Sequence, residues 1–213
     1  MAIIATNDVQ ERFLIPAGNY IARCYGMVEV GTVKENFKGQ DKMQRKVRIF
    51  WELPTELREF KDGEGEKPCG ISKEFTVSMH EKANLRKVLE SWRGQGFTEQ
   101  DAKAFDITKL LGAPCMLNII HETGKTDPSK IYAVIASVSR MPKGMPAPAQ
   151  VNKTLIFEYD KFDQVEFEKL PDWLKNSMKT TPEYIAATSN GTMHLPTNNE
   201  AAMSQTMEEE CPF

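Results

Sequence analysis

The sequence predicts a mainly β (α+β) fold of five strands with one helix between the third and fourth strands. Two observations support this. Apolar residues alternate with polar ones in five separate segments, as in half-buried strands. In residues 78–97 the apolar spacing changes to three and four residues, as on one face of a helix. With 213 residues, the chain is long enough for one domain with a buried core and an appendage.

The first two predicted strands form a hairpin. Residues 14–30 begin with the turn at Pro16–Gly18. One side of this strand, expected to face the core, carries Tyr20, Ala22, Cys24, Val28 and Val30, and the other side carries Ile21, Arg23, Tyr25, Met27 and Glu29. After a polar loop, the core side of the second strand carries Met43, Val47, Ile49, Trp51 and Leu53, and its other side carries Gln44, Lys46, Arg48 and Phe50.

The remaining elements follow in order. A charged connection, residues 61–70, leads to a third strand at about residues 71–78. Ser78 and Glu81 match a capping box, and Gly94 or Gly96 can end the helix whose apolar face is Leu85, Val88, Leu89 and Trp92. Thr98, with Asp101 three residues later, opens a short helical stretch, and two more strands span residues 114–122 and 130–139.

This order of elements is the one expected of the OB-fold, a small Greek-key barrel that binds oligonucleotides or oligosaccharides. Periodicity alone would also permit an unrelated α+β sheet. We therefore expect an OB-fold domain over residues 1–145, and a Pro-rich linker with a packed extension over residues 146–185, including a helical turn at Asp172 to Lys179. Residues 186–213 are polar and weakly patterned, and we expect a disordered tail with an acidic tip.

Known catalytic and metal-binding motifs are absent or incomplete in the sequence. The "TGKT" stretch lacks the first glycine of a P-loop, since Ile119 occupies that position. His80-Glu81 and His121-Glu122 lack the second histidine of a zinc helix, and the four cysteines never form a CxxC pair. We therefore expect no enzyme activity, no metal and no cofactor. With neither a secretory signal nor a long apolar run, the sequence predicts a cytoplasmic protein.

Basic and aromatic residues on the hairpin indicate a binding face for nucleic acid. Its candidate contacts are Arg23, Tyr25, Lys34, Phe37, Lys38, Lys42, Arg45, Lys46, Arg48 and Phe50, joined by Lys125 and Lys130 in the last turn. Single strands require this combination, because cations contact phosphates and flat rings stack on unpaired bases. The alternative is an ordinary exposed strand. Charge is uneven as well, with a mildly basic body followed by an acidic end.

The run "SMHEKANLRKVLESWRGQGFTEQDAKAFDITKLLGAPCMLNIIHE" and the later "YAVIASVSRMPKGMPAP" resemble phage-encoded single-stranded-DNA-binding proteins built on an OB-fold. The likeness covers about residues 15–185, and its most specific part is the "SWRG" helix ending. The final "MEEECPF" looks like the acidic, Pro-Phe-terminated tip of bacterial SSB proteins, although it uses Glu in place of Asp and inserts Cys211.

The resemblance implies sequence-independent binding of single-stranded DNA in phage replication or recombination, inside the bacterial host cell. It also implies that the tip recruits partner proteins through Glu208, Glu209, Glu210, Pro212 and Phe213. The oligomeric state stays open. The alternatives are a strand-annealing or RNA-binding protein on the same barrel, and a metal-dependent nuclease.

Overall fold

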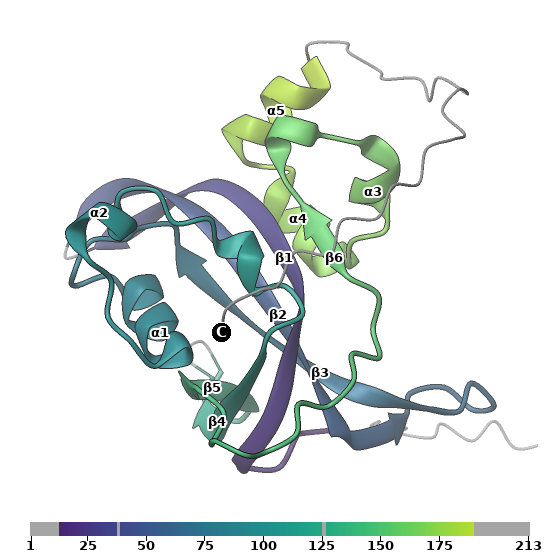
Figure 1. Cartoon of the computed structure of the whole chain (residues 1–213). Helices are drawn as coiled ribbons and strands as arrows, with labels where there is room; N and C mark the ends of the chain where they lie inside the picture. The colour runs from purple at the N-terminus through teal and green to yellow at the C-terminus, as the bar shows by residue number, and fades with distance from the viewer. Residues whose placement is uncertain (1–12, 38, 125–126, 190–213) are drawn as a thin grey trace, which may run out of the picture.

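The structure, a computed structural model, describes residues 13–37, 39–124 and 127–189 (Figure 1). Its main feature is one strongly curved sheet with the strand order β3-β2-β1-β4-β5, in which all these neighbours are antiparallel. The strands are β1 (Gly18–Phe37), β2 (Gln40–Glu59), β3 (Glu66–Thr76), β4 (Pro114–Thr123) and β5 (Ile131–Ser139). The prediction of a mainly β, α+β fold is therefore confirmed.

The sheet differs from the expected five-stranded barrel in two respects. A sixth strand, β6 (Leu155–Phe157), runs parallel to β1 at Gly26–Val28. The sheet is also not closed, since no backbone pairing joins β3 to β5 among the residues that the structure describes. The Lys73 ammonium on β3 bonds to the carbonyl of Ile135 on β5, at 2.6 Å. The two end strands thus approach each other but leave a seam between them.

Strand β1 contains two register shifts that the alternation pattern could not predict. The shifts lie between Cys24 and Gly26 and between Glu29 and Gly31. After the first shift Met27 packs in the main core, while Val28 packs on the opposite face of the sheet. The prediction that Val28 and Val30 share the side of Cys24 is therefore wrong, because an extra residue in a strand reverses the facing of those that follow.

The first two strands are also longer than predicted. The segment expected to be a polar loop continues as paired strand, from Thr32 opposite Arg45 to Phe37 opposite Gln40. This two-stranded arm extends beyond the rest of the sheet (Figure 1). Ion pairs between side chains on β1 and β2 join the two strands of the arm.

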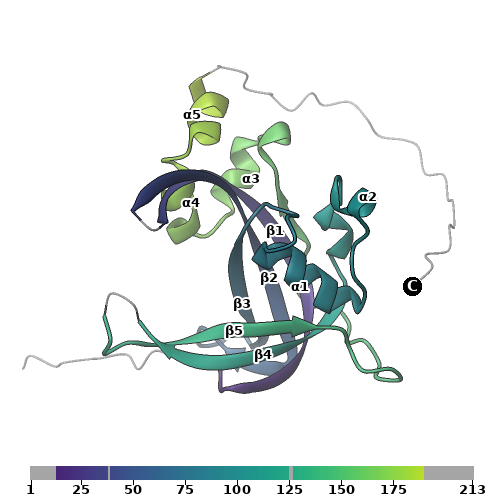
Figure 2. The same ribbon diagram turned by 90° about the vertical axis from the view of Figure 1, so that its left-hand side faces the viewer.

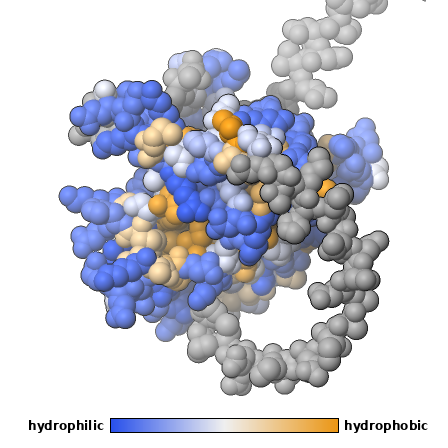
Figure 3. All heavy atoms as spheres, turned by 90° about the horizontal axis from the view of Figure 1, so that it is seen from above, coloured by the Kyte–Doolittle hydropathy of each residue, from blue (hydrophilic) through white to orange (hydrophobic). Residues whose placement is uncertain are grey.

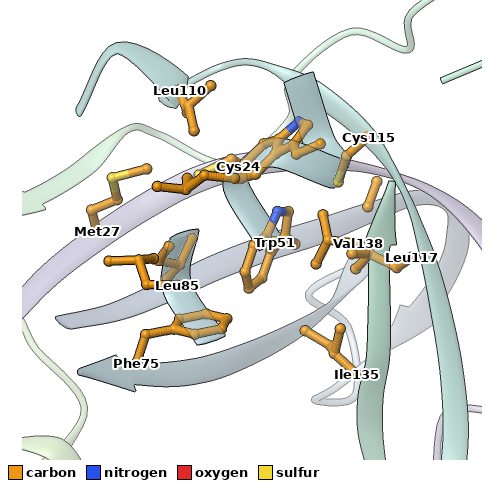
Figure 4. Packing of buried hydrophobic residues seen from close by; sticks show 14 of the residues in the cluster. Cys24, Met27, Trp51, Phe75, Leu85, Leu110, Cys115, Leu117, Ile135 and Val138 are labelled. Atoms are coloured by element: carbon orange, nitrogen blue, oxygen red, sulfur yellow. The ribbon is translucent and has the colours of Figure 1, made fainter. Parts of the chain in front are cut away.

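The main core lies inside the curve of the sheet, with Trp51 in its middle (Figure 4). Trp51 is fully buried, and its ring centroid lies 5.7 Å from that of Trp92. Cys24, as predicted, and Cys115 are buried in the same cluster, and burial raises the pKa of the Cys24 thiol to about 12. The core side expected for the second strand is therefore confirmed for Val47, Ile49, Trp51 and Leu53. It is wrong for Met43, which is 60% exposed on the two-stranded arm.

Helix α1 (Asn84–Arg93) covers one end of this core with Leu85, Leu89 and Trp92. Gly94 ends the helix in the left-handed conformation, with φ of 70°, as the sequence predicts. The predicted capping box is wrong, because the N-cap is Ala83 and no side chain caps the helix there. Two short pieces follow, α2 (Glu99–Ala102), which Thr98 caps as predicted, and the 3₁₀ turn η1 (Ile107–Leu110).

The C-terminal extension, which we define as residues 148–189, packs on the outer face of β1 and β2. It contains β6, η2 (Tyr159–Lys161), α3 (Gln164–Glu168), α4 (Asp172–Met178) and α5 (Pro182–Ser189). These elements lie on the other side of the sheet from α1 and α2 (Figure 2). A second apolar cluster joins them to the sheet and contains Val28, Val30, Phe50, Phe157, Phe167, Leu170, Leu174 and Met178. The polar segment expected to be disordered from residue 186 is helical through Ser189.

Two carboxylates fix the extension at its two ends. Glu52, fully buried on β2, accepts hydrogen bonds from the backbone N–H groups of Val151 (2.8 Å) and Asn152 (2.7 Å). Glu183 on α5 accepts bonds from the N–H and the hydroxyl of Thr32, at 2.8 and 2.5 Å. Burial alone would raise the pKa of Glu183, but these bonds hold it below its usual value. Charge-assisted bonds of this kind stabilise a docked segment.

Gly31 allows the close approach of the extension to β1. Its φ of 101° lies in the region that favours glycine, and a Cβ added there would lie 2.7 Å from the Thr181 hydroxyl oxygen. The backbone therefore needs glycine here for both conformation and space.

Candidate nucleic-acid interface

Tyr25 and Phe50, two of the three aromatic residues predicted as contacts, are covered by the C-terminal extension. Phe50 is only 7% exposed and belongs to the second cluster, and Tyr25 is half-buried against it, 6.0 Å from Phe50 between ring centroids. Burial, followed by the nearby Glu52 carboxylate, raises the pKa of Tyr25. Both residues point away from the main core as predicted, but the expectation that this makes them accessible is wrong.

Two of the predicted cations are also engaged within the protein. The Arg23 guanidinium donates to the carbonyl of Pro148, where the extension begins. Lys46 is only 6% exposed, and its ammonium lies 2.8 Å from the Glu35 carboxylate and bonds to Thr76. These side chains hold the fold together rather than face solvent.

Cations of the two-stranded arm are paired with acids across the strands. Lys34 lies 2.7 Å from Asp41, and Arg45 lies 2.6 Å from Glu29. Lys42 is exposed on the same arm. Lys38 and the side chain of Phe37 lie outside the described residues. The excess of basic residues counted along the sequence is therefore largely compensated in the described part of the arm.

Arg48 is a predicted site residue that lines an open groove. It lines a groove of about 480 Å³ along the free edge of β3, at the seam with β5. Its lining includes Gly70 and Ser72 of β3, together with Phe60, Tyr132 and the segment Phe13–Ile15. Phe60 is 55% exposed and Phe13 is 45% exposed. The groove thus presents aromatic rings beside a cation.

A second hollow of about 450 Å³ continues this groove toward the β4–β5 turn. The two share Leu14 and Tyr132, and the second hollow is also lined by Ser129 and Lys130. Lys130 is one of the predicted site residues, and its ammonium lies 3.3 Å from Asp127. Lys125 lies outside the described residues. We call the two hollows together the seam groove.

Further cations surround the seam groove. The Arg58 guanidinium carbon lies 4.0 Å from the centroid of the Phe13 ring. Lys73 lies at the seam itself, where burial lowers the pKa of its ammonium and the nearby Glu122 opposes this shift. Arg48 bonds to Ser72 at 3.2 Å and to Glu74 at 3.1 Å. Its Nε is buried and has no hydrogen-bond partner in the described part of the chain.

Another hollow, of about 190 Å³, lies between η1, β6 and the strands β1 and β2. Its lining carries one cation, Arg45, and three acids, Glu29, Asp106 and Glu158. The residues lining the seam groove, by contrast, include Arg48 and Lys130 and no carboxylate; the acids paired with these two cations, Glu74 and Asp127, lie outside the lining. Since a polyanion requires an excess of positive charge, the seam groove fits it better. Figure 3 shows that hydrophobic side chains also gather in the middle of one face of the molecule, with hydrophilic ones around them.

Comparison of the chain with protein-family models, with curated proteins and with solved structures finds no match in any of the three.

Metal-ligating side chains do not converge in the described residues, where no group of three or more His, Cys, Asp or Glu could hold an ion. In the same residues, no helix is long and apolar enough to cross a membrane. The predicted partner-binding tip, Glu208, Glu209, Glu210, Pro212 and Phe213, lies outside the described residues.

Sequence reasoning missed Phe13, Phe60, Tyr132 and Trp173 as candidate ring contacts. Phe60 lies in the turn between β2 and β3, and Phe13 precedes β1, so neither belongs to an alternating pattern. Tyr132 lies on β5, where the strand pattern could have revealed it. Phe60 could have been noticed because it is a large aromatic residue within the charged stretch "LREFKDGEGEK", where an exposed ring is expected.

Proposed function

We propose that this protein binds single-stranded DNA without sequence preference, through the seam groove. The observation that carries the proposal is the lining of the groove, in which Phe13, Phe60 and Tyr132 lie beside Arg48 and Lys130 with no lining carboxylate. Rings stack on bases of any sequence, and cations neutralise phosphates. No hydrogen-bonding code for a particular base is required.

Preference for single strands follows from the same chemistry. The rings can stack only on bases that are unpaired and turned toward the protein, and a duplex keeps its bases in the helical stack. Duplex DNA would be held by the cations alone. Binding to single strands is therefore expected to be the stronger of the two.

The fold that we propose for this function is an OB-type barrel with an open seam. Five of the strands and helix α1 follow the OB order, with the helix between β3 and β4. Lys73 and Ile135 bring the two end strands close together at one point of the seam. The sixth strand then belongs to the C-terminal extension rather than to the barrel.

The biological role that we propose is coating of single strands during phage DNA replication or recombination, without catalysis. The resemblance of residues 15–185 and of "MEEECPF" to proteins of this class supports it. The acidic tip would recruit partner proteins, since a peptide with negative charge and an aromatic end suits a basic-rimmed apolar pocket.

A binding experiment with the full chain tests the proposal. The anisotropy of labelled oligothymidine would be followed while the protein is added, in parallel with duplex DNA and RNA of the same length. We expect the tightest binding to the single-stranded DNA. Equal affinity for the duplex would contradict the proposal, tighter binding to RNA would favour an RNA-binding protein, and faster pairing of complementary strands would favour annealing. Cleavage of the DNA with Mg²⁺ or Mn²⁺ would indicate a nuclease.

A further inference from the structure

Trp173 differs from the other two tryptophans of the chain in its exposure. Trp51 is fully buried, and Trp92 is 3% exposed with its Nε1 donating to the Pro114 carbonyl at 2.9 Å. Trp173 is 53% exposed although it lies on a well-packed helix. Tryptophan is enriched at interfaces, because its large ring offers apolar contact area and its N–H a polar contact.

Helix α4 holds Trp173 in a fixed place. Leu174 and Met178 are fully buried in the second cluster, so the helix is tightly docked on the sheet. Lys175 fixes the helix further, because its ammonium lies 2.9 Å from Glu168 and 3.0 Å from Asp172. The exposed ring is therefore presented by a rigid element, which lowers the entropic cost of binding to it.

Arg48 connects Trp173 to the seam groove. Its guanidinium carbon lies 4.8 Å from the centroid of the Trp173 ring, and the same side chain lines the groove. The guanidinium occupies one face of the ring, while more than half of the residue stays exposed. Trp173 does not itself line the groove, and the shared Arg48 side chain places its ring beside the groove.

From this geometry we infer that Trp173 is a base-stacking residue, supplied to the seam groove by the C-terminal extension. The inference rests on the proposed function and adds a ligand contact to it. Arg48 holds the indole from one side, and a base of the single strand stacks on its exposed surface. The extension therefore covers the rings of Tyr25 and Phe50 and provides a different ring for DNA.

Tryptophan fluorescence of the full chain tests this inference, because Trp173 is the one exposed tryptophan of the three. Oligothymidine would be added to the wild type and to Trp173→Phe and Trp173→Ala, with anisotropy of the labelled DNA measured in the same samples. We expect the DNA to quench the wild type and not Trp173→Phe. Trp173→Phe keeps an aromatic ring and should bind nearly as well as the wild type. The affinity of Trp173→Ala for the DNA should fall by a factor of about five or more, as expected for the loss of one stacking contact.

The outcomes separate this inference from the proposed function. If the wild type binds DNA but Trp173→Ala binds equally well, the inference is wrong and the proposed function stands. Quenching that persists in Trp173→Phe would also overturn the inference, because it would come from Trp51 or Trp92. If the wild type shows no anisotropy change, both are wrong. As a matched control, Ile185→Ala removes a side chain of equal exposure on α5 and should change neither signal.

Discussion

Tyr25 and Phe50 lie beside each other beneath the C-terminal extension, with ring centroids 6.0 Å apart. Without the extension, this face of the sheet would leave both rings uncovered. In this chain Phe157, Phe167 and Leu174 cover that face. The extension thus covers this face of β1 and β2, while the seam between β3 and β5 stays open.

Phe50→Ala is expected to lower the stability of the protein. Truncation of a buried phenylalanine typically costs about 3 to 5 kcal/mol, and Phe50 is 7% exposed. Urea denaturation measures the loss, and Phe60→Ala is the control, expected to change the free energy of unfolding by less than about 1 kcal/mol. An unchanged unfolding midpoint for Phe50→Ala, together with weaker DNA binding, would mean that the covered face opens to DNA.

Phe60→Ala is expected to weaken the binding of single-stranded DNA. Loss of one stacking ring should weaken the binding of oligothymidine by about 1 to 3 kcal/mol, with the fold intact because the side chain is 55% exposed. Anisotropy titration measures this loss of affinity, with Ile185→Ala on α5 as a control of similar exposure. Equal affinities of the two variants would exclude Phe60 from the interface.

Salt should weaken the binding to a limited extent. Arg48 and Lys130 line the groove and Arg58 lies beside it, so about two to three phosphates are neutralised and log K should fall against log salt with a slope of about −1.5 to −2. Titrations at a series of NaCl concentrations give this slope. A slope several times steeper would show that the strand also contacts the cations of the two-stranded arm.

Glu183→Gln should make stability less dependent on pH. The folded pKa of Glu183 lies below its usual value, so its contribution is present above the unfolded pKa and is lost as pH falls through the folded pKa. We expect the variant to be less stable at neutral pH by about 1.5 kcal/mol, from the loss of charge-assisted bonds to Thr32. The difference in the free energy of unfolding between the wild type and the variant should disappear in acid.

Urea denaturation of the wild type and of Glu183→Gln, from neutral to acid pH, measures this difference in stability. Glu166→Gln is the control, because that exposed carboxylate contacts only the exposed ammonium of Lys169 among the bonds described. If the stability difference between the wild type and Glu183→Gln stays constant down to low pH, the Glu183 carboxylate does not fix the extension.

Much of the secondary structure could be predicted from the sequence, because local patterns determine it. The spacing of Leu85, Leu89 and Trp92 identifies α1, and Gly94 ends it. Alternation identifies β4 and β5 and the inward side of Trp51. The shift after Cys24 could not be predicted, because an extra residue in a strand leaves no mark in composition and reverses the facing of Met27 and Val28.

The candidate site was harder to predict because its accessibility depends on contacts between distant segments. Glu52 binds Asn152 across 100 positions of sequence, and this contact places the cover over Tyr25 and Phe50. The arm cations are compensated by cross-strand acids that only the register reveals, as for Lys34 and Asp41. Arg48 was predicted correctly as a residue on the outer face, but its role beside Trp173 requires the docked extension.

The most direct test of the central claim, that single-stranded DNA lies in the seam groove, is photocrosslinking. Oligonucleotides in which bromodeoxyuridine replaces thymidine would be irradiated with the full-length protein, and the attached peptides mapped by mass spectrometry. The groove predicts crosslinks at Phe13, Phe60 and Tyr132, which disappear when excess unlabelled oligothymidine competes. Crosslinks confined to the two-stranded arm, residues 32–45, or to the hollow beside η1 would contradict it.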